Sequence, residues 1–214
     1  MRVLITGSSN GIGKAVAEKF LSLGHTVFGI DIAEKTIENP NYRHFVADVT
    51  DDLPDVPSVE ILINNAGVQD SGRDIEVNLK GAMRVTEKYA IQDKIKSVLF
   101  IASASARSGA EFPEYVASKG GLVSYMKNVA LRIAKYGATS NSLSPGGVTT
   151  ALNTRVIQNP DLWNRIMDET LIPKWASSEE IAEWAYFVTV INKSMTAEDL
   201  LIDNGEYAKA TFIW

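Results

Sequence analysis

Residues 6–13 read Thr-Gly-Ser-Ser-Asn-Gly-Ile-Gly, and the pattern on either side of this stretch decides the fold. The apolar run Val3–Ile5 precedes it, and apolar side chains at helical spacing follow it as far as Leu23. Glycines between a strand and a helix let the backbone turn tightly and approach a pyrophosphate, whose charge the helix N-terminus stabilises. The spacing G-x-x-x-G-x-G therefore predicts a dinucleotide-binding turn, with an ordinary glycine-rich turn as the alternative.

Short apolar runs alternate with amphipathic stretches along the rest of the chain. Ser177 is expected to open a late helix through a capping box with Glu180. The alternation predicts an α/β fold, with a doubly wound parallel sheet of strand order 3-2-1-4-5-6-7 in a single domain that spans 1–214. Further strands are expected at 26–30, 43–47, 60–63, 97–101, 138–143 and 200–202, and long helices at about 74–93 and 115–136.

The segment between Val49 and Glu60 departs from this alternation, because its ten residues include Pro54 and Pro57 and cannot form a full crossover helix. The connection must cover a path of roughly 22 Å between the third and fourth strands, and ten extended residues reach roughly 33 Å. We therefore expect an extended strap in place of a helix.

The composition excludes several kinds of site. The net charge of −5 and the pI of about 5.1 argue against nucleic-acid binding, which favours a basic patch. The chain has no cysteine, which excludes disulfides and thiolate sites and fits a cytoplasmic location. Its two histidines, His25 and His44, lack ligand spacing, so no metal is expected. No apolar run is long enough for a membrane span, and a strand at the N-terminus leaves no room for a signal peptide.

Asp31 ends the second expected strand, 18 positions after Gly13. A carboxylate there can accept hydrogen bonds from an adenosine ribose and repels a 2′-phosphate, and a solvated turn aspartate is the alternative. Residues 8–12 contain no basic side chain, and Ile32 supplies none. The sequence therefore predicts NAD in preference to NADP. Asp48 and Val49 end the third strand, where a side chain could meet the adenine amino group.

Tyr115 and Lys119 are four positions apart on an expected helix, and therefore lie on one face of it. A free tyrosine has a pKa of about 10, and a nearby ammonium lowers that pKa. Such a pair can give a proton to a carbonyl oxygen or take one from an alcohol. Ser103, at the end of the fifth strand, could hydrogen-bond the same oxygen.

Together these residues resemble the short-chain dehydrogenase/reductase family, which has a compact Rossmann-type fold. The likeness covers nearly the whole chain: Thr6-Gly7-x-x-x-Gly11-Ile12-Gly13, Asp31, Asp48-Val49, Asn64-Asn65-Ala66-Gly67, Asn78-Leu79-x-Gly81, Ser103, Tyr115-x-x-x-Lys119, Pro145-Gly146 and Asp203-Asn204-Gly205.

The resemblance implies an oxidoreductase that transfers a hydride between NAD(H) and a carbonyl or secondary alcohol. It implies four catalytic residues: Tyr115 as the acid/base, Lys119 on the nicotinamide ribose and beside the tyrosine, Ser103 on the substrate oxygen, and Asn78 on a water of a proton relay. The cofactor-binding residues that we expect, besides Tyr115 and Lys119, are Gly7, Ser9, Asn10, Gly11, Ile12, Gly13, Asp31, Ile32, Asp48, Val49, Asn65, Ala66, Gly67, Pro145, Gly146, Val148 and Thr150.

Three features depart from the family's pattern. The strap replaces a helix, and only ten residues separate Gly67 from Asn78. Ser103 lies 12 positions before Tyr115, one fewer than the family's spacing, so Ser105 is an alternative partner for the substrate oxygen.

Residues 151–176 are expected to form a flap over a small-molecule substrate, with an apolar face that packing could also explain. The sequence does not name that substrate. Two other functions stay open: an NADP-dependent 3-oxoacyl-type reductase, and a non-catalytic nucleotide-binding regulator on the same fold. A homodimer or homotetramer is expected through the two long helices, with the apolar tail Thr211–Trp214 as a second candidate surface.

Overall fold

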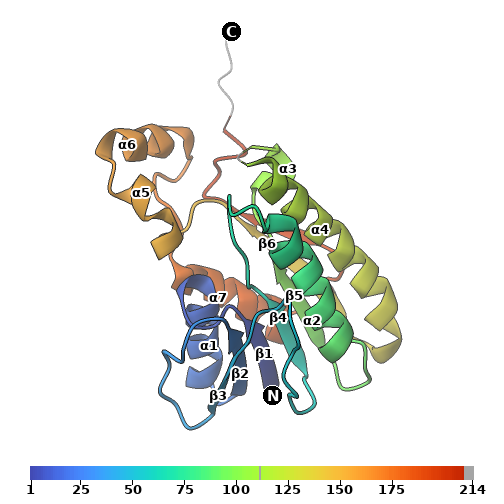
Figure 1. Cartoon of the computed structure of the whole chain (residues 1–214). Helices are drawn as coiled ribbons and strands as arrows, with labels where there is room; N and C mark the ends of the chain where they lie inside the picture. The colour runs from blue at the N-terminus through green and yellow to red at the C-terminus, as the bar shows by residue number, and fades with distance from the viewer. Residues whose placement is uncertain (111, 210–214) are drawn as a thin grey trace.

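The computed structural model describes residues 1–110 and 112–209, and its centre is a seven-stranded parallel sheet (Figure 1). The strand order β3-β2-β1-β4-β5-β6-β7 confirms the predicted topology. The strands are β1 (Arg2–Thr6), β2 (Thr26–Asp31), β3 (Tyr42–Val46), β4 (Ile61–Asn64), β5 (Ser97–Ile101), β6 (Thr139–Pro145) and β7 (Asp199–Ile202).

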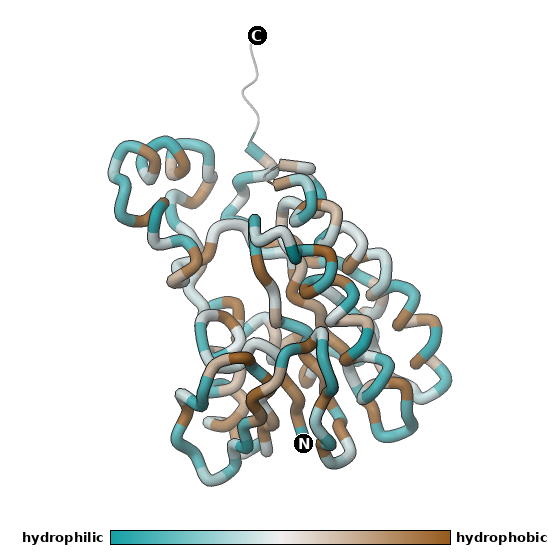
Figure 2. The backbone as a smooth tube through the Cα atoms, viewed as in Figure 1, coloured by the Kyte–Doolittle hydropathy of each residue, from teal (hydrophilic) through white to brown (hydrophobic). Residues whose placement is uncertain are grey.

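The central strands are apolar because helices cover both of their faces. Leu4 of β1 is aligned with Phe28 of β2 on one side and Leu62 of β4 on the other. Leu4 and Leu62 have no exposed surface. Apolar residues therefore concentrate in the strands at the centre of the molecule, whereas the outer loops are largely hydrophilic (Figure 2).

Each face of the sheet has its own hydrophobic core. On one face, Phe20 of α1 (Gly11–Ser22) and Ile181 of α7 (Ser178–Tyr186) pack against β1 and β4. On the other face, Val85 of α2 (Ala82–Tyr89) and Met126 of α4 (Pro113–Ile133) do the same. Every strand pair is parallel, so the carboxyl ends of all seven strands lie at one edge of the sheet.

The helix bounds refine the predicted ones. The helix expected over 74–93 is a π-helical turn, η1 (Ile75–Gly81), followed by the short α2. The α4 helix begins at Pro113 and continues as the 3-10 turn η2 (Ala134–Tyr136). The capping box of Ser177 and Glu180 at the start of α7 is confirmed. The remaining elements are α3 (Ser105–Ser108), η3 (Ala151–Asn153), α5 (Thr154–Ile157), α6 (Pro160–Glu169) and η4 (Phe187–Ile191).

The expected strap is confirmed, because residues 47–60 contain neither helix nor strand. Side chains from α2 and the turn after it hold the strap through its carbonyl groups. The hydroxyl of Tyr89 donates to Pro54 O at 2.5 Å, and Gln92 Nε2 donates to Val59 O at 2.8 Å. The segment 32–41, between β2 and β3, also lacks a helix.

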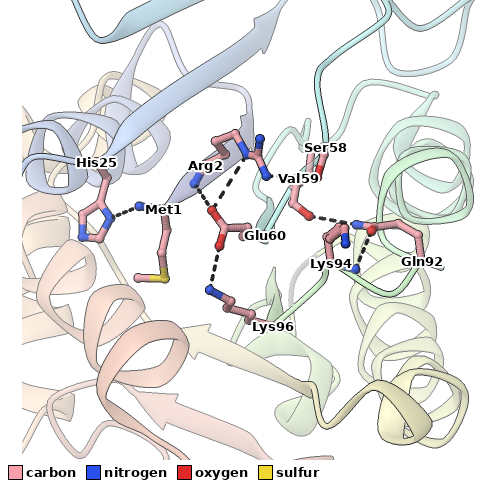
Figure 3. Close-up of polar contacts among 9 residues, drawn as sticks. All are labelled: Met1, Arg2, His25, Ser58, Val59, Glu60, Gln92, Lys94 and Lys96. Carbon is pink, nitrogen blue, oxygen red and sulfur yellow. Dashed lines mark hydrogen bonds and ion pairs between the residues drawn. The ribbon is translucent and has the colours of Figure 1, made fainter.

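The end of the sheet opposite the strands' carboxyl ends is closed by ion pairs (Figure 3). The carboxylate of Glu60 accepts a hydrogen bond from the backbone N–H of Arg2 at 2.8 Å and one from Lys96 Nζ at 2.6 Å. The hydrogen bond from Lys96 has the largest effect on this carboxyl. Burial opposes it, but the bonds from Lys96 and Arg2 together outweigh burial and hold the pKa of Glu60 below its usual value. Glu60 therefore joins the starts of β1, β4 and β5.

None of the helices within residues 1–110 and 112–209 is both long enough and apolar enough to cross a membrane.

Candidate active site

A cleft of about 1240 Å³ lies at the carboxyl ends of the strands, where α/β sheets bind their ligands. Its wall is formed by the loops that follow β1 to β7, with several residues of the segment 151–176. It contains all but two of the predicted cofactor-binding residues: Gly7, Asn10, Gly11, Ile12, Asp31, Ile32, Asp48, Val49, Asn65, Ala66, Gly67, Tyr115, Lys119, Pro145, Gly146, Val148 and Thr150.

Ser9 and Gly13, the two exceptions, are buried behind the cleft wall. A Cβ on Gly13 would lie 2.0 Å from the carbonyl oxygen of Gly7, so only glycine allows α1 to pack this closely against the turn. Ser9 donates its backbone N–H to Asp31 and its hydroxyl to Glu34 O at 3.1 Å. Both residues shape the turn from within it.

The first turn of α1 borders the middle of the cleft. The helix has no side-chain cap at Asn10 and no acidic residue in its first turn. Its N-terminal backbone N–H groups and the positive end of the helix dipole are therefore suited to a pyrophosphate.

The carboxylate of Asp31 lies at one end of the cleft and is held by two backbone donors. Ser9 N donates to Oδ2 at 2.8 Å, and Ala33 N donates to Oδ1 at 2.9 Å. Ile32, beside it, is 72% exposed and offers an apolar surface at the cleft wall.

Asp48 closes the same end of the cleft. Burial opposes ionisation of its carboxyl, but hydrogen bonds from Thr50 and the Arg73 guanidinium outweigh burial and hold the pKa of Asp48 below its usual value. Arg73 lines the cleft and was not among the predicted residues. Nothing in the sequence pointed to it, because the segment after Gly67 shows no periodicity and Arg73 meets Asp48 and Thr50 only through a long-range contact with the loop after β3.

Tyr115 and Lys119 face the other end of the cleft from successive turns of α4, as predicted. Lys119 Nζ lies 5.6 Å from the centroid of the Tyr115 ring and donates a hydrogen bond to Ile101 O at 2.9 Å. Burial lowers the pKa of Lys119 from 10.5 to about 8, with the charge of Asp74 opposing the change. The ammonium is therefore an uncommon, desolvated positive charge beside a phenol.

Ser103 and Ser105 both line the cleft with Tyr115, and their hydroxyl oxygens are 2.5 Å apart. The backbone N–H of Ser105 also donates to Ser103 Oγ at 3.2 Å. The end of β5 and the start of α3 thus present a pair of coupled hydroxyls to the tyrosine. The structure brings both candidate serines to the site.

Asn78 is buried behind the wall, in η1, and does not line the cleft. Its amide accepts from Val68 N at 2.8 Å and donates to Val68 O at 2.9 Å and to Ser118 Oγ at 3.0 Å. A Cβ on Gly67 would lie 3.1 Å from Asn78 Oδ1 and 3.5 Å from Lys119 Nζ. The asparagine therefore fixes the Gly67–Val68 loop next to the lysine.

The loop after β6 completes this end of the cleft. Gly146 N donates to Ile202 O at 2.9 Å, and an isolated bridge joins Val148 to Ala176 at the base of the segment 151–176. Leu152, Ile166 and Trp175 of that segment line the cleft.

Of the arginines near the segment 151–176 and the end of β5, Arg155 lines the cleft, whereas Arg107 pairs with Asp199 at 2.8 Å. Arg165 lines a second, smaller hollow. In the part of the chain that the structure describes, no three His, Asp or Glu side chains are grouped for a metal ion.

The order of chemistry along the cleft matches a nicotinamide dinucleotide. An acceptor for ribose hydroxyls lies at one end, a helix N-terminus in the middle, and a lysine beside a tyrosine at the other end. The residues present therefore fit this cofactor.

Comparisons with known proteins show which family this chain is similar to. A family model described as enoyl-(acyl carrier protein) reductase matches residues 7–206. The short chain dehydrogenase adrF of Penicillium roqueforti is 31% identical over 193 residues, which cover 76% of this chain and 75% of that protein. The 3-oxoacyl-(acyl-carrier-protein) reductase FabG of Buchnera aphidicola is 28% identical over 236 residues, which cover 95% of this chain and 96% of that protein.

Among solved structures, a short chain dehydrogenase family protein of Francisella tularensis shares 26% identity with a TM-score of 0.86. The superposition covers 97% of this chain and 99% of that one. The matches in sequence and fold lead to one conclusion. This chain belongs to the short-chain dehydrogenase/reductase family, whose members are oxidoreductases that use a nicotinamide dinucleotide with alcohol or carbonyl substrates.

Proposed function

We propose that this protein is an NAD-preferring dehydrogenase or reductase in which Tyr115 exchanges a proton with the substrate oxygen. The observation that supports this proposal most strongly is the arrangement of Tyr115, Lys119 and the Ser103–Ser105 pair around one end of the cleft. A phenol, a desolvated ammonium and a hydroxyl pair beside an open space are the groups that proton exchange with a carbonyl requires.

The bound cofactor supplies or accepts the hydride, and the protein supplies orientation and the proton. In the direction of reduction, Tyr115 donates its hydroxyl proton to the substrate oxygen as the carbonyl carbon gains the hydride. The ammonium of Lys119 stabilises the phenolate that remains. In the direction of oxidation, the phenolate takes the proton back. The serine pair positions the substrate oxygen.

Asn78 acts on this site indirectly. Its amide forms hydrogen bonds with the backbone of Val68, and these bonds position the loop at Gly67 and Val68 next to Lys119. A water bound beside Asn78 would carry the proton between Lys119 and solvent. The segment 151–176 would cover the substrate, with Leu152, Ile166 and Trp175 forming an apolar wall.

The preference for NAD rests on Asp31. Its carboxylate accepts hydrogen bonds from the ribose hydroxyls of NAD and repels the 2′-phosphate of NADP. We expect kcat/KM to be larger with NAD(H) than with NADP(H), and Asp31→Ala to reduce the difference. An equal or larger kcat/KM with NADPH in the wild-type protein would refute this preference.

A second candidate is an NADP-dependent 3-oxoacyl-type reductase, which the match to FabG favours. The carboxylate of Asp31 disfavours binding of NADP, the cofactor of this second candidate. The apolar wall of the cleft is compatible with a 3-oxoacyl substrate. A spectrophotometric screen with both cofactors against acyl thioesters, sugars, hydroxysteroids and small diols distinguishes the two candidates. Turnover of a 3-oxoacyl thioester with NADPH alone would establish the second one.

A further inference from the structure

A chain of buried hydrogen bonds runs behind the glycine turn and ends at the turn that carries Asp31. Ser8 Oγ is 2.9 Å from the hydroxyl of Tyr42, and that hydroxyl is 3.0 Å from His44 Nδ1. His44 Nε2 is 2.9 Å from the carbonyl oxygen of Ala33. Ser8 is fully buried, and Tyr42 is 8% exposed.

The direction of each bond follows from the acceptor at its end. Ala33 O can only accept, so His44 Nε2 carries a hydrogen and donates it. In the neutral ring, Nδ1 then accepts from Tyr42, whose hydroxyl is left to accept from Ser8. Burial raises the pKa of Tyr42, and the negative charge of Asp31 adds to the rise, so the phenol stays protonated as this chain requires.

The turn that follows Asp31 has no regular structure to hold it, since residues 32–41 form no helix. Hydrogen bonds from side chains hold this turn instead. Ser9 Oγ donates to Glu34 O at 3.1 Å, Thr36 Oγ1 donates to Ser9 O at 2.6 Å, and His44 holds Ala33 from the other side. Ala33 N in turn donates to the carboxylate of Asp31.

The backbone of β2 makes room for the hydrogen-bond chain at Gly29. A Cβ at this position would lie 2.2 Å from the Tyr42 hydroxyl and 2.3 Å from Ser8 Oγ. Any other residue in the middle of β2 would therefore displace the two hydroxyls.

From this arrangement we infer that Tyr42 and His44 are positioning residues for cofactor recognition. They hold the 31–34 turn so that the carboxylate of Asp31 is ready for the adenosine ribose before the cofactor arrives. The inference rests on the proposed NAD site. When the turn is released, only a fraction of the molecules has the binding-competent turn, and the apparent affinity falls by that fraction.

The test compares Tyr42→Phe with Tyr89→Phe. Each change removes one buried phenolic hydroxyl, but Tyr89 bonds to the strap and lies outside the cleft. We expect Tyr42→Phe to weaken ADP-ribose binding by about tenfold and to raise the KM for NAD by a similar factor, which corresponds to about a tenth of the molecules having a competent turn. The inhibition constant of nicotinamide mononucleotide and kcat at saturating NAD should stay within twofold of the wild-type values. Tyr89→Phe should change none of these quantities.

His44→Gln provides a second variant, because its amide can still donate to Ala33 O, and it should bind ADP-ribose more tightly than His44→Leu. If Tyr42→Phe is poorly folded, this pair of variants carries the test. Unchanged ADP-ribose affinity in Tyr42→Phe, or equal affinities of the two His44 variants, would overturn the inference and leave the proposed function standing. A wild-type protein that binds neither ADP-ribose nor NAD would instead refute the proposed function.

Discussion

Lys119 illustrates how a single residue can oppose the stability of the fold while serving the site. Its side chain is 5% exposed, and its hydrogen bond to Ile101 O replaces only part of the hydration that the ammonium loses. Burial therefore lowers its pKa to about 8. Below that pH the ammonium predominates, which is the form that the proposed role requires.

This burial predicts a pH-dependent effect of Lys119→Met on stability. Between pH 8 and 10.5 the unfolded chain holds the lysine proton and the native protein does not, so the wild-type free energy of unfolding rises with pH through this residue. Methionine does not titrate, so the free energy of unfolding of Lys119→Met does not rise in this way. The difference in free energy of unfolding, Lys119→Met minus wild type, should therefore fall by about 3 kcal/mol between pH 8 and pH 10.5. Urea unfolding at several pH values measures it. A difference that stays constant with pH would show that Lys119 is not desolvated.

At the scale of elements, the strap replaces a helix and depends on side chains from α2. Tyr89→Phe leaves the carbonyl of Pro54 without its buried donor, which should lower the free energy of unfolding by about 1–2 kcal/mol. Faster hydrogen exchange is expected in residues 49–59, because the loss is local. Denaturant unfolding and exchange measured by mass spectrometry check both effects. A variant as stable as wild type, with unchanged exchange, would show that this hydrogen bond contributes nothing.

The elements that could be predicted from sequence are those that local signals encode. The glycine turn, the prolines of the strap and the capping box at Ser177 each depend on neighbouring residues, and the structure shows a turn, a strap and a capping box there. The strand order is a long-range feature, but the alternation of strands and helices predicted it, and it is confirmed. The spacing of Tyr115 and Lys119 likewise placed both side chains at the cleft.

Features that depend on long-range contacts could not be predicted. The π-helical turn at 75–81 interrupts an amphipathic pattern that indicates an ordinary helix. The hydrogen bonds between Ser8 and Tyr42 and between His44 and Ala33 join segments that are brought together by the register of the sheet. The approach of Arg73 to Asp48 is of the same kind. Gly13 and Asn78 matched the family pattern, and Ser9 stands at one of its variable positions, but only the packing shows that all three lie behind the wall.

At the scale of the whole molecule, α2 and α4 form one layer over the sheet (Figure 1). Glu87 of α2 links them, since its carboxylate accepts hydrogen bonds from Tyr125 at 3.0 Å and from Arg132 at 2.5 and 2.7 Å. Leu131, on α4, is 80% exposed. An apolar side chain of this size at the surface of a helix layer is compatible with contact to a second subunit.

We therefore keep the prediction of a homodimer or homotetramer that pairs through α2 and α4. Light scattering should give a mass of two or four chains at micromolar concentration, and Leu131→Glu should lower that mass. Leu23→Glu, on the opposite face of the sheet and 47% exposed in the wild type, provides the control. A wild-type monomer would refute the assembly. The tail Thr211–Trp214, the second candidate surface, lies outside the described residues.

The central claim is that Tyr115 exchanges the proton with the substrate, and single-turnover kinetics of Tyr115→Phe test it most directly. The phenyl ring keeps the shape of the site and removes only the hydroxyl. The rate of hydride transfer should fall by at least about 10²-fold, the lower end of what general acid–base catalysis contributes, while the Kd for NAD stays close to the wild-type value. A Tyr115→Phe protein that transfers hydride at more than about a tenth of the wild-type rate would show that another group carries the proton.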